Sequence, residues 1–157
     1  MLLHRIAKTD RVRDLTGMGA KLYGGRWNRK GVPMLYCSES RALATVEFLV
    51  HVPIALTPAQ YSLATLRAPK NETCEEIQLR SLPRTWREFP APDRLAKIGS
   101  EWALNHSSLL LRVPSEVVEH EYNVLINPAH VDAKKIKILK VEKYRFDPRL
   151  LRSKRFD

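Results

Sequence analysis

The stretch that decides the fold of this chain is GMGAKLYGGRWNRKGVPMLYCSESRALATVEFLVH, residues 17–51. Five of the six glycines of the protein lie between residues 17 and 31, so much of this backbone takes conformations or close approaches that a Cβ would resist. Arg26, Trp27 and Asn28 stand within this glycine-rich loop. A planar cation, a large ring and an amide are groups that bind a phosphorylated, aromatic small molecule. We therefore expect the functional site here.

A strand and a helix follow the glycine-rich loop. Val32–Cys37 is a short apolar run that predicts a strand. Ser38 or Ser40 can then cap a helix, because a serine hydroxyl accepts hydrogen bonds from the free amides of the first helical turn. We expect this helix to run to about His51 and to stop before Pro53.

Glu47 is the unusual residue of the predicted helix. At about 100° per residue, Leu43, Val46 and Val50 share one apolar stripe, and Glu47 falls on its edge. An inward carboxylate is costly unless it is paired or faces a polar cleft. Glu47 therefore indicates a functional site on this helix.

The rest of the chain predicts an α+β fold in one domain, 1–157, with a basic tail at about 151–157 that is frayed. Strands and helices do not alternate regularly along the chain, so we expect a mixed or antiparallel sheet with two main helices. The other expected elements are strands at 2–6, 60–66, 109–113, 122–126 and 135–144, a helix at 93–105, loops at 7–32 and 68–74 with one helical turn near 10–15, and an irregular segment or lid at 75–92.

Composition restricts the class of protein. A chain of 157 residues with 44% hydrophobic and 28% charged residues can bury a core without disulfides or metals. Cys37 and Cys74 are too few for a disulfide framework or a zinc site, and the histidines lack the spacing of zinc ligands. Charged residues follow the first two leucines, so we expect no signal peptide, no membrane span and a cytoplasmic protein.

The net charge of +10 is concentrated near the C-terminal end. Residues 134–157 hold ten basic and three acidic residues, a net charge of +7. Such a patch could bind nucleic acid or an acidic partner protein, although a solvated face is the commonest meaning of a charge run. The aromatic residues that accompany it, among them Tyr144 and Phe146, are too few for a stacking platform, which argues against direct binding of nucleic acid.

Several motifs, taken together, resemble the RES domain family, whose members are toxins of bacterial type II toxin–antitoxin pairs. The motifs run through most of the chain and are Gly17-Met-Gly19-Ala20, Gly24-Gly25-Arg26-Trp27-Asn28, Gly31, Tyr36, Glu47, Val113-Pro114-Ser115, Asn123 and Asn127-Pro128. The family takes its name from an arginine, a glutamate and a serine, which match Arg26, Glu47 and Ser115.

The resemblance implies an ADP-ribosyltransferase-like fold and an enzyme that acts on NAD+. Family members cleave the nicotinamide–ribose bond by hydrolysis or phosphorolysis, or they transfer ADP-ribose to a protein. We therefore expect NAD+ as the substrate, inorganic phosphate as a possible co-substrate, and neither another cofactor nor a metal. The expected partner is a cognate antitoxin of the Xre type, through which DNA would be contacted.

The resemblance also gives roles to the matched residues. Arg26 would bind the pyrophosphate with two parallel N–H bonds, a geometry that suits a guanidinium better than an ammonium. Glu47 would lie near the anomeric carbon, where cleavage develops positive charge, and nicotinamide needs no general acid because it leaves neutral from a pyridinium. Ser115 would bind ribose or carboxamide, or else cap the turn after Pro114.

Four further residues are candidates for binding the substrate. Tyr36 would contact the nicotinamide ring or ribose, or pack at the strand edge. Asn28 and Asn123 would bind ribose or phosphate oxygens, or satisfy turn and strand-end groups. Lys21 is a candidate second phosphate cation, as is Arg5. Each of these readings has a structural alternative that the sequence leaves open.

Three other functions remain open from the sequence. Transfer of ADP-ribose to a host protein would use the same residues as NAD+ cleavage. A basic nucleic-acid-binding or ribonuclease toxin would use the charged C-terminal end. A pure interaction protein would leave Glu47 unexplained.

Overall fold

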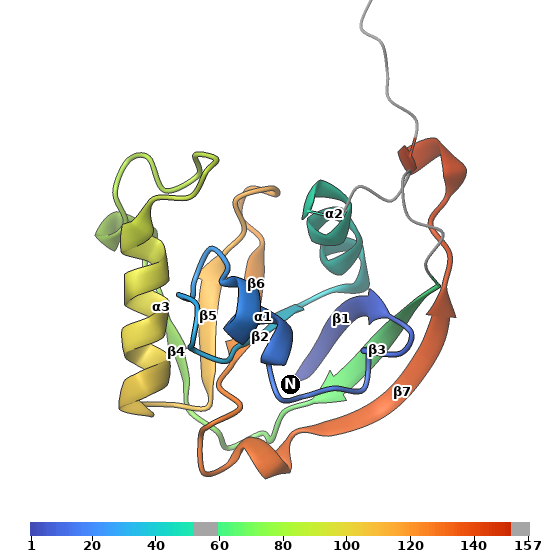
Figure 1. Ribbon diagram of the computed structural model, residues 1–157, viewed down its shortest axis with the longest axis horizontal. Helices are drawn as coiled ribbons and strands as arrows, with labels where there is room; N and C mark the ends of the chain where they lie inside the picture. The colour runs from blue at the N-terminus through green and yellow to red at the C-terminus, as the bar shows by residue number, and fades with distance from the viewer. Residues whose placement is uncertain (52–59, 152–157) are drawn as a thin grey trace, which may run out of the picture.

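The structure, a computed structural model, describes residues 1–51 and 60–151. Within these ranges, seven strands form one sheet that carries two main α-helices and one short helix (Figure 1). The strands are β1 (Leu2–Lys8), β2 (Leu35–Ser38), β3 (Tyr61–Arg67), β4 (Cys74–Glu76), β5 (Leu110–Pro114), β6 (Tyr122–Ile126) and β7 (Lys137–Tyr144). The helices are α1 (Met18–Tyr23), α2 (Arg41–His51) and α3 (Asp93–Asn105), with short 3-10 turns η2 (Leu79–Ser81), η3 (Ala133–Lys135) and η4 (Pro148–Leu151).

The centre of the sheet is a narrow junction between two groups of strands. The strand order is β4-β5-β6-β2-β1-β3-β7, and among the described strands only β4 and β5 pair in parallel. β1 pairs with β3 along its whole length, but it pairs with β2 at one position, His4 opposite Ser38. The candidate site opens where these two central strands meet, since both line the same pocket.

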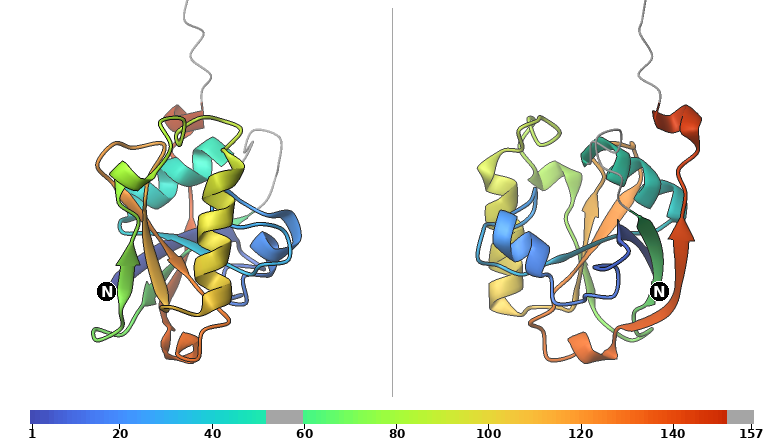
Figure 2. Two further views of the ribbon diagram at one scale, coloured as in Figure 1. Left: turned by 90° about the vertical axis from the view of Figure 1, so that its left-hand side faces the viewer. Right: turned by 45° about the vertical axis from the view of Figure 1, so that its right-hand side comes forward.

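Three apolar clusters hold the layers together. The largest is built from the strands and includes Leu3, Leu66, Leu110 and Ile126. A second cluster packs α3 against β5 and β6, with α3 in front in the left view of Figure 2. This cluster includes Trp27, Leu95, Trp102, Leu111, Val113 and Leu125. A third joins α2 to β1 and β3 through Ile6, Ala44, Phe48 and Leu63. Each main helix therefore buries one apolar face on its own group of strands.

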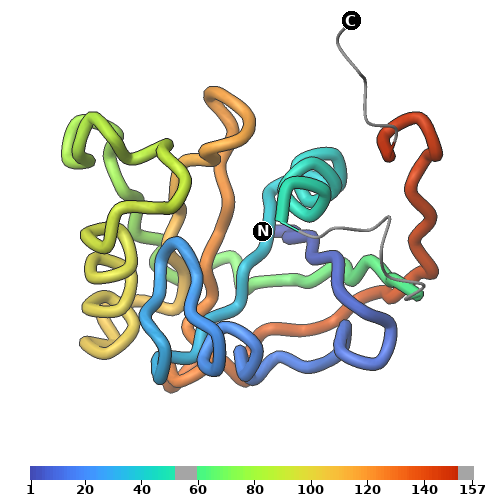
Figure 3. Tube along the Cα trace, turned by 45° about the horizontal axis from the view of Figure 1, so that its top comes forward, coloured from blue at the N-terminus to red at the C-terminus, as the bar shows by residue number. Residues whose placement is uncertain are grey.

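The contact between α3 and the glycine-rich loop, which lie side by side in Figure 3, is unusually close. A Cβ built on Gly99 would lie 2.0 Å from the carbonyl oxygen of Trp27, so the helix backbone rests directly on the loop. The Trp27 ring is 2% exposed, and the hydroxyl of Ser100 accepts a hydrogen bond of 2.9 Å from the backbone N–H of Arg29. α3 therefore helps to position the loop that carries Arg26.

Most of the expected elements are confirmed. The α+β class, the mixed sheet and the helix at 93–105 are as predicted, and Ser40 caps α2 by accepting a 3.0 Å hydrogen bond from the N–H of Leu43. Two short elements were missed: α1 lies inside the predicted loop, and β4 inside the segment predicted to be loop and then irregular. The tail beyond Leu151 lies outside the described residues.

The predicted apolar face of α2 was right at Leu43 but wrong at Val46 and Val50. Val46 is 36% exposed and Val50 is 59% exposed, whereas Leu43, Ala44 and Thr45 are buried. The helix packs on the sheet through neighbours of the predicted stripe, because Ala44 and Phe48 contact β1 and β3.

No helix among the described residues is long and apolar enough to cross a membrane.

Candidate active site

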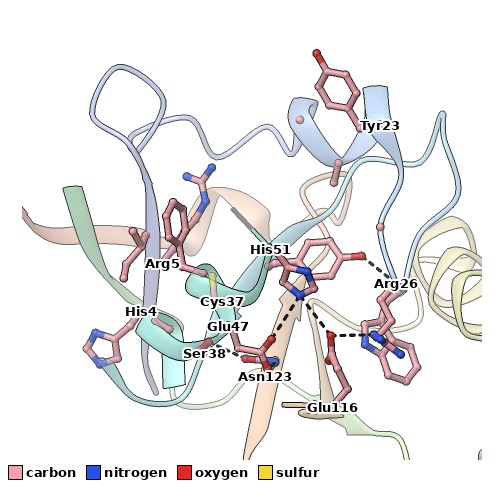
Figure 4. A pocket seen from close by; sticks show the side chains of 18 of the residues that line it. His4, Arg5, Tyr23, Arg26, Cys37, Ser38, Glu47, His51, Glu116 and Asn123 are labelled. Carbon is pink, nitrogen blue, oxygen red and sulfur yellow. Dashed lines mark hydrogen bonds and ion pairs between the residues drawn. The ribbon is translucent and has the colours of Figure 1, made fainter. Parts of the chain in front are cut away.

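A pocket of about 690 Å³ lies between β1, β2, α1 and α2 (Figure 4). Its wall is completed by residues of the glycine-rich loop, by the turn that follows β5 and by strand β6. This volume is ordinary for a small-molecule site, for which about 300–1,000 Å³ is typical. α2 contributes Ala44, Glu47, Phe48 and His51, which recur at helical spacing and so share one face. The pocket has mainly apolar walls, with Arg26, Glu47, His51 and Glu116 gathered at one end and Arg5 placed apart from them on β1.

Glu47 lies at the charged end, with 14% of its side chain exposed. Its Oε1 accepts two hydrogen bonds, one of 2.6 Å from the hydroxyl of Ser115 and one of 2.5 Å from the amide of Asn123. The amide oxygen of Asn123 in turn accepts a 2.7 Å hydrogen bond from Ser38. The structure therefore brings together three of the residues predicted from the sequence, and their orientation is fixed without a ligand.

Ser115 contacts Glu47 and caps a turn at the same time. Its hydroxyl oxygen accepts hydrogen bonds of 3.1 and 3.0 Å from the backbone N–H groups of Val117 and Val118. These two donors place the hydroxyl proton toward Glu47, because the oxygen's acceptor positions face the turn. The turn cap predicted as one alternative for Ser115 is therefore confirmed, while its contact with ribose or carboxamide stays a prediction.

Arg26 lines the pocket, but its guanidinium is bound mainly to the protein. Nη1 donates to the carbonyl oxygen of Trp86 at 2.7 Å and Nη2 to that of Glu88 at 3.3 Å, while Nε forms an ion pair of 3.0 Å with Oε1 of Glu116. The side chain is 9% exposed. Arg26 thus joins three segments around the pocket, and its bidentate contact with pyrophosphate stays a prediction.

Tyr36 and Asn28 anchor the glycine-rich loop. The Tyr36 hydroxyl donates to Oδ1 of Asn28 at 2.7 Å and accepts from the backbone N–H of Trp27 at 3.0 Å. The Asn28 amide donates to the carbonyl oxygens of Ala20 and Val32 at 2.8 and 3.0 Å. Burial, the largest influence, raises the pKa of Tyr36 above its usual range. Asn28 is 1% exposed, which favours its structural role over the predicted ligand contact.

We expect Tyr36→Phe to lower the free energy of unfolding by about 1–3 kcal/mol, because it removes a donor and leaves the buried N–H of Trp27 without its acceptor. Urea unfolding measures this change. Tyr23→Phe is the matched control. Tyr23 is 79% exposed, so the loss of its hydroxyl group should change the free energy of unfolding by less than about 0.5 kcal/mol. Equal stability of the two variants would contradict the anchoring role.

The two other candidate cations lie in different places. Lys21 is exposed on α1 and does not line the pocket, although its neighbours Ala20 and Tyr23 do. Arg5 lines the pocket from β1. Its Nη1 donates to the carbonyl oxygens of Val12 and Asp14 at 3.0 and 3.1 Å, so it also fixes the chain that leads to α1. Of Lys21 and Arg5, only Arg5 lines the pocket and could contact a ligand bound there.

His51 and Glu116 belong to the site and were not predicted. Nε2 of His51 lies 3.3 Å from Oε1 of Glu116 and 3.8 Å from Oε2 of Glu47. Hydrogen bonding to Glu116, and then to Glu47, raises the pKa of His51 to about 9. Burial alone would raise the pKa of Glu116, but His51 and Arg26 outweigh burial and lower it. His51 lies one helical turn after Glu47, and this spacing was a sequence signal by which His51 could have been found.

The ligand atoms of Glu47, His51 and Glu116 lie within 4.8 Å of one another, a donor set that could hold a metal ion. Arg26, however, lies 3.0 Å from the Glu116 oxygen that such an ion would use. A divalent cation would have to displace this guanidinium and compete with a protonated histidine. The arrangement therefore fits a chain of internal ion pairs better than a metal centre.

The raised pKa of His51 predicts a pH dependence of stability. His51 binds its proton more tightly in the folded state, so its contribution is complete below about pH 6.5 and is lost as the pH rises toward 9. Because the side chain is 49% exposed, we expect a fall of only about 1 kcal/mol in the free energy of unfolding across this range. Denaturant unfolding at several pH values measures it. A His51→Gln variant that kept the same fall would contradict this assignment.

Known proteins resemble this chain over most of its length. A family model described as "RES domain" matches residues 2–148. The Prs ADP-ribosylating toxin of Sphingobium sp. (strain YBL2) is 43% identical over 148 residues, which cover 93% of this chain and 92% of that protein. Toxin Res of Yersinia enterocolitica is 37% identical over 152 residues, covering 96% of this chain and 99% of that protein.

A solved structure has the same fold. A chain in the crystal structure of the M. tuberculosis MbcT–MbcA toxin–antitoxin complex superposes with a TM-score of 0.76 at 17% identity. The match covers 91% of this chain and 83% of that chain. The seven-stranded mixed sheet with its two main helices is thus an arrangement that a solved protein also adopts.

Proposed function

This chain belongs to the RES domain family, and we propose that it is the toxin of a toxin–antitoxin pair and cleaves the bond between nicotinamide and ribose in NAD+. The observation that carries the proposal is the carboxylate of Glu47, half-buried at one end of a pocket and held there by Ser115 and Asn123. Removing a charged group from water costs free energy, so a carboxylate held in this position indicates a functional role.

The chemistry of the bond suits this carboxylate. Cleavage gives the ribose oxocarbenium character, so a negative charge near the anomeric carbon stabilises the transition state more than the ground state. Two hydrogen bonds fix the orientation of Glu47 before the substrate binds, which avoids reorganisation during the reaction. Nicotinamide leaves as a neutral molecule, and the site accordingly needs no general acid for it.

The walls of the pocket suit the rest of NAD+. Arg26 and Arg5 supply positive charge at two places for the pyrophosphate, while Phe48 and Tyr36 supply aromatic surface for a ring. The net charge of +10 would draw a dianionic substrate toward the protein. We infer that the nicotinamide end lies near Glu47 and that the pyrophosphate lies between the arginines.

Transfer of ADP-ribose to a protein is the second candidate function. It is favoured by the name of the Sphingobium relative, which is an ADP-ribosylating toxin of 43% identity. The same residues would break the same bond, and only the acceptor would differ. Tyr23 lines the pocket and is 79% exposed (Figure 4), which supports access for a second protein at this side of the pocket.

An antitoxin partner is part of the proposal. The solved neighbour with the same fold comes from a toxin–antitoxin complex. Because NAD+ loss would harm the cell that makes the toxin, a partner that covers the pocket is the simplest control. We expect the antitoxin to be of the Xre type, as the resemblance of the sequence implies.

Purified protein free of any antitoxin tests the proposal. NAD+ is followed by proton and phosphorus NMR with and without inorganic phosphate, and we expect release of nicotinamide. A phosphorylated ribose product would identify phosphate as the acceptor, and ADP-ribose would identify water. Nicotinamide release that requires a cell extract, with a gain of mass on one extract protein, would favour the transferase. No release under any of these conditions would overturn the proposal.

A further inference from the structure

We propose that Glu116 is a second carboxylate of this site and that His51 is the counter-ion it shares with Glu47. The inference rests on the proposed function, because it concerns how the charge of Glu47 is kept available for NAD+ cleavage. Glu116 and His51 are positioning residues here: Glu116 holds Arg26, and His51 holds both carboxylates. Neither role follows from the motifs of the sequence.

The geometry places four charges in alternating order. Figure 4 shows Arg26, Glu116, His51 and Glu47 joined by successive contacts across the pocket. Along this line the distances are 3.0 Å from Arg26 to Glu116, 3.3 Å from Glu116 to His51 and 3.8 Å from His51 to Glu47. An oxygen of each carboxylate lies within 4.8 Å of one of the other. Two carboxylates this close cannot both stay ionised without a cation near them.

The cations are divided unequally between the two carboxylates. Glu116 contacts both Arg26 and His51, whereas His51 is the one cation that forms an ion pair with Glu47 among the described residues. The charged groups that face His51 are Glu47 from its own helix and Glu116 from the turn after β5, with Arg26 of the glycine-rich loop behind Glu116 and Arg5 of β1 lining the same pocket. Loss of the charge of His51 would therefore affect Glu47 most.

This division predicts where a proton goes when His51 is replaced. In His51→Gln the ring and its charge are gone, but Arg26 still stabilises the ionised form of Glu116. The pair of carboxylates then takes up one proton at a higher pH than in the wild type. We expect Glu47 to receive it, because the ion pair with Arg26 holds Glu116 ionised more strongly than the hydrogen bonds from Ser115 and Asn123 hold Glu47. Because protonated Glu47 cannot stabilise an oxocarbenium ion, the variant loses activity near neutral pH and recovers it as the pH rises.

A second substitution separates this role from a merely structural one. In the double variant His51→Gln/Glu116→Gln, the repelling carboxylate is absent, so Glu47 is the one carboxylate left in this cluster of the described residues. We expect its pH profile to return toward that of the wild type even though its maximal rate is reduced. A packing defect caused by loss of the imidazole would not be repaired by a change at Glu116.

The experiment is the dependence of kcat for nicotinamide release on pH, between about pH 3.5 and 10, for the wild type, His51→Gln and the double variant. The acid limb of His51→Gln should lie about 1–3 pH units above that of the wild type, and the double variant should reverse this shift. The KM for NAD+ should change less than kcat in His51→Gln. An unshifted limb in His51→Gln, or a shift that persists in the double variant, would overturn the proposal.

A measurement without substrate keeps this test distinct from that of the proposed function. Carbon-13 NMR of labelled glutamate carboxyl groups reports the proton uptake of the pair directly, and thermal unfolding verifies that each variant is folded. If the carboxyl titration shifts as expected while no NAD+ is cleaved, the charge coupling holds and the proposed function fails. If NAD+ is cleaved but the titration does not shift between wild type and His51→Gln, the shared counter-ion is refuted.

Discussion

Glu47→Gln is expected to reduce the rate of nicotinamide release by about 1,000-fold. Glutamine keeps the shape of the side chain, and its carbonyl oxygen can still accept from Ser115 and Asn123, so the fold should survive. What is lost is a full negative charge beside the developing positive charge of the ribose. At about 4 Å and an effective dielectric near 20, this interaction amounts to ~4 kcal/mol, the equivalent of three orders of magnitude in rate.

The measurement compares kcat of the wild type and Glu47→Gln at one pH, with Glu101→Gln as a matched control. Glu101 lies on α3 with 60% of its side chain exposed, where the same change of charge should leave the rate within about twofold. Thermal unfolding confirms that both variants are folded. If Glu47→Gln retained most of the activity, the carboxylate of Glu47 would have a structural role only, and other residues would have to stabilise the transition state.

Gly99→Ala is expected to destabilise the protein by about 3 kcal/mol or more. The new Cβ would lie 2.0 Å from the carbonyl oxygen of Trp27 and 3.0 Å from its carbonyl carbon, and both atoms belong to the backbone. No side-chain rotation can relieve this contact, so α3 and the glycine-rich loop must separate. Because the loop also positions Arg26, nicotinamide release should fall together with stability.

Gly19→Ala is the matched control for Gly99→Ala in urea unfolding. Gly19 is also helical, in α1, and a Cβ built on it would have no atom within 4 Å. Alanine there should leave stability unchanged or raise it by about 0.5–1 kcal/mol, since glycine loses more backbone freedom on folding. If Gly99→Ala were as stable as this control, the close approach of α3 to Trp27 would not be needed for the fold.

The elements that the sequence predicted well are those with many residues in one pattern. Asp93–Asn105 is a helix at the bounds expected from its apolar spacing, and β6 matches its predicted run of Tyr122–Ile126. α1 and β4 were missed because six and three residues are too few to display a period. β4 also depends on parallel pairing with β5, a contact between segments far apart in the chain.

The residues of the candidate site also differ in how well the sequence predicted them. Glu47 could be found because a single helix carries it among apolar neighbours, although Val46 and Val50 turned out to be exposed. Ser115 and Asn123 entered through the resemblance to the RES family, which the family match confirms, and the structure adds their hydrogen bonds to Glu47. Asn28 carried no signal that distinguished a ligand contact from a loop anchor.

The sequence by itself determined the family, the fold class and the residue on which the proposed chemistry depends. These follow from local order along the chain: a period, a cap, a motif or a polar residue in an apolar face. The tertiary structure decided which charges meet. Arg26, Glu116, His51 and Glu47 come from three separate segments, and whether a cation faces a ligand or a carboxylate depends on distances of 3–4 Å across the fold. Electrostatic energy falls with distance through space and not along the chain, so no local pattern could reveal that Glu116 engages Arg26 and shares His51 with Glu47.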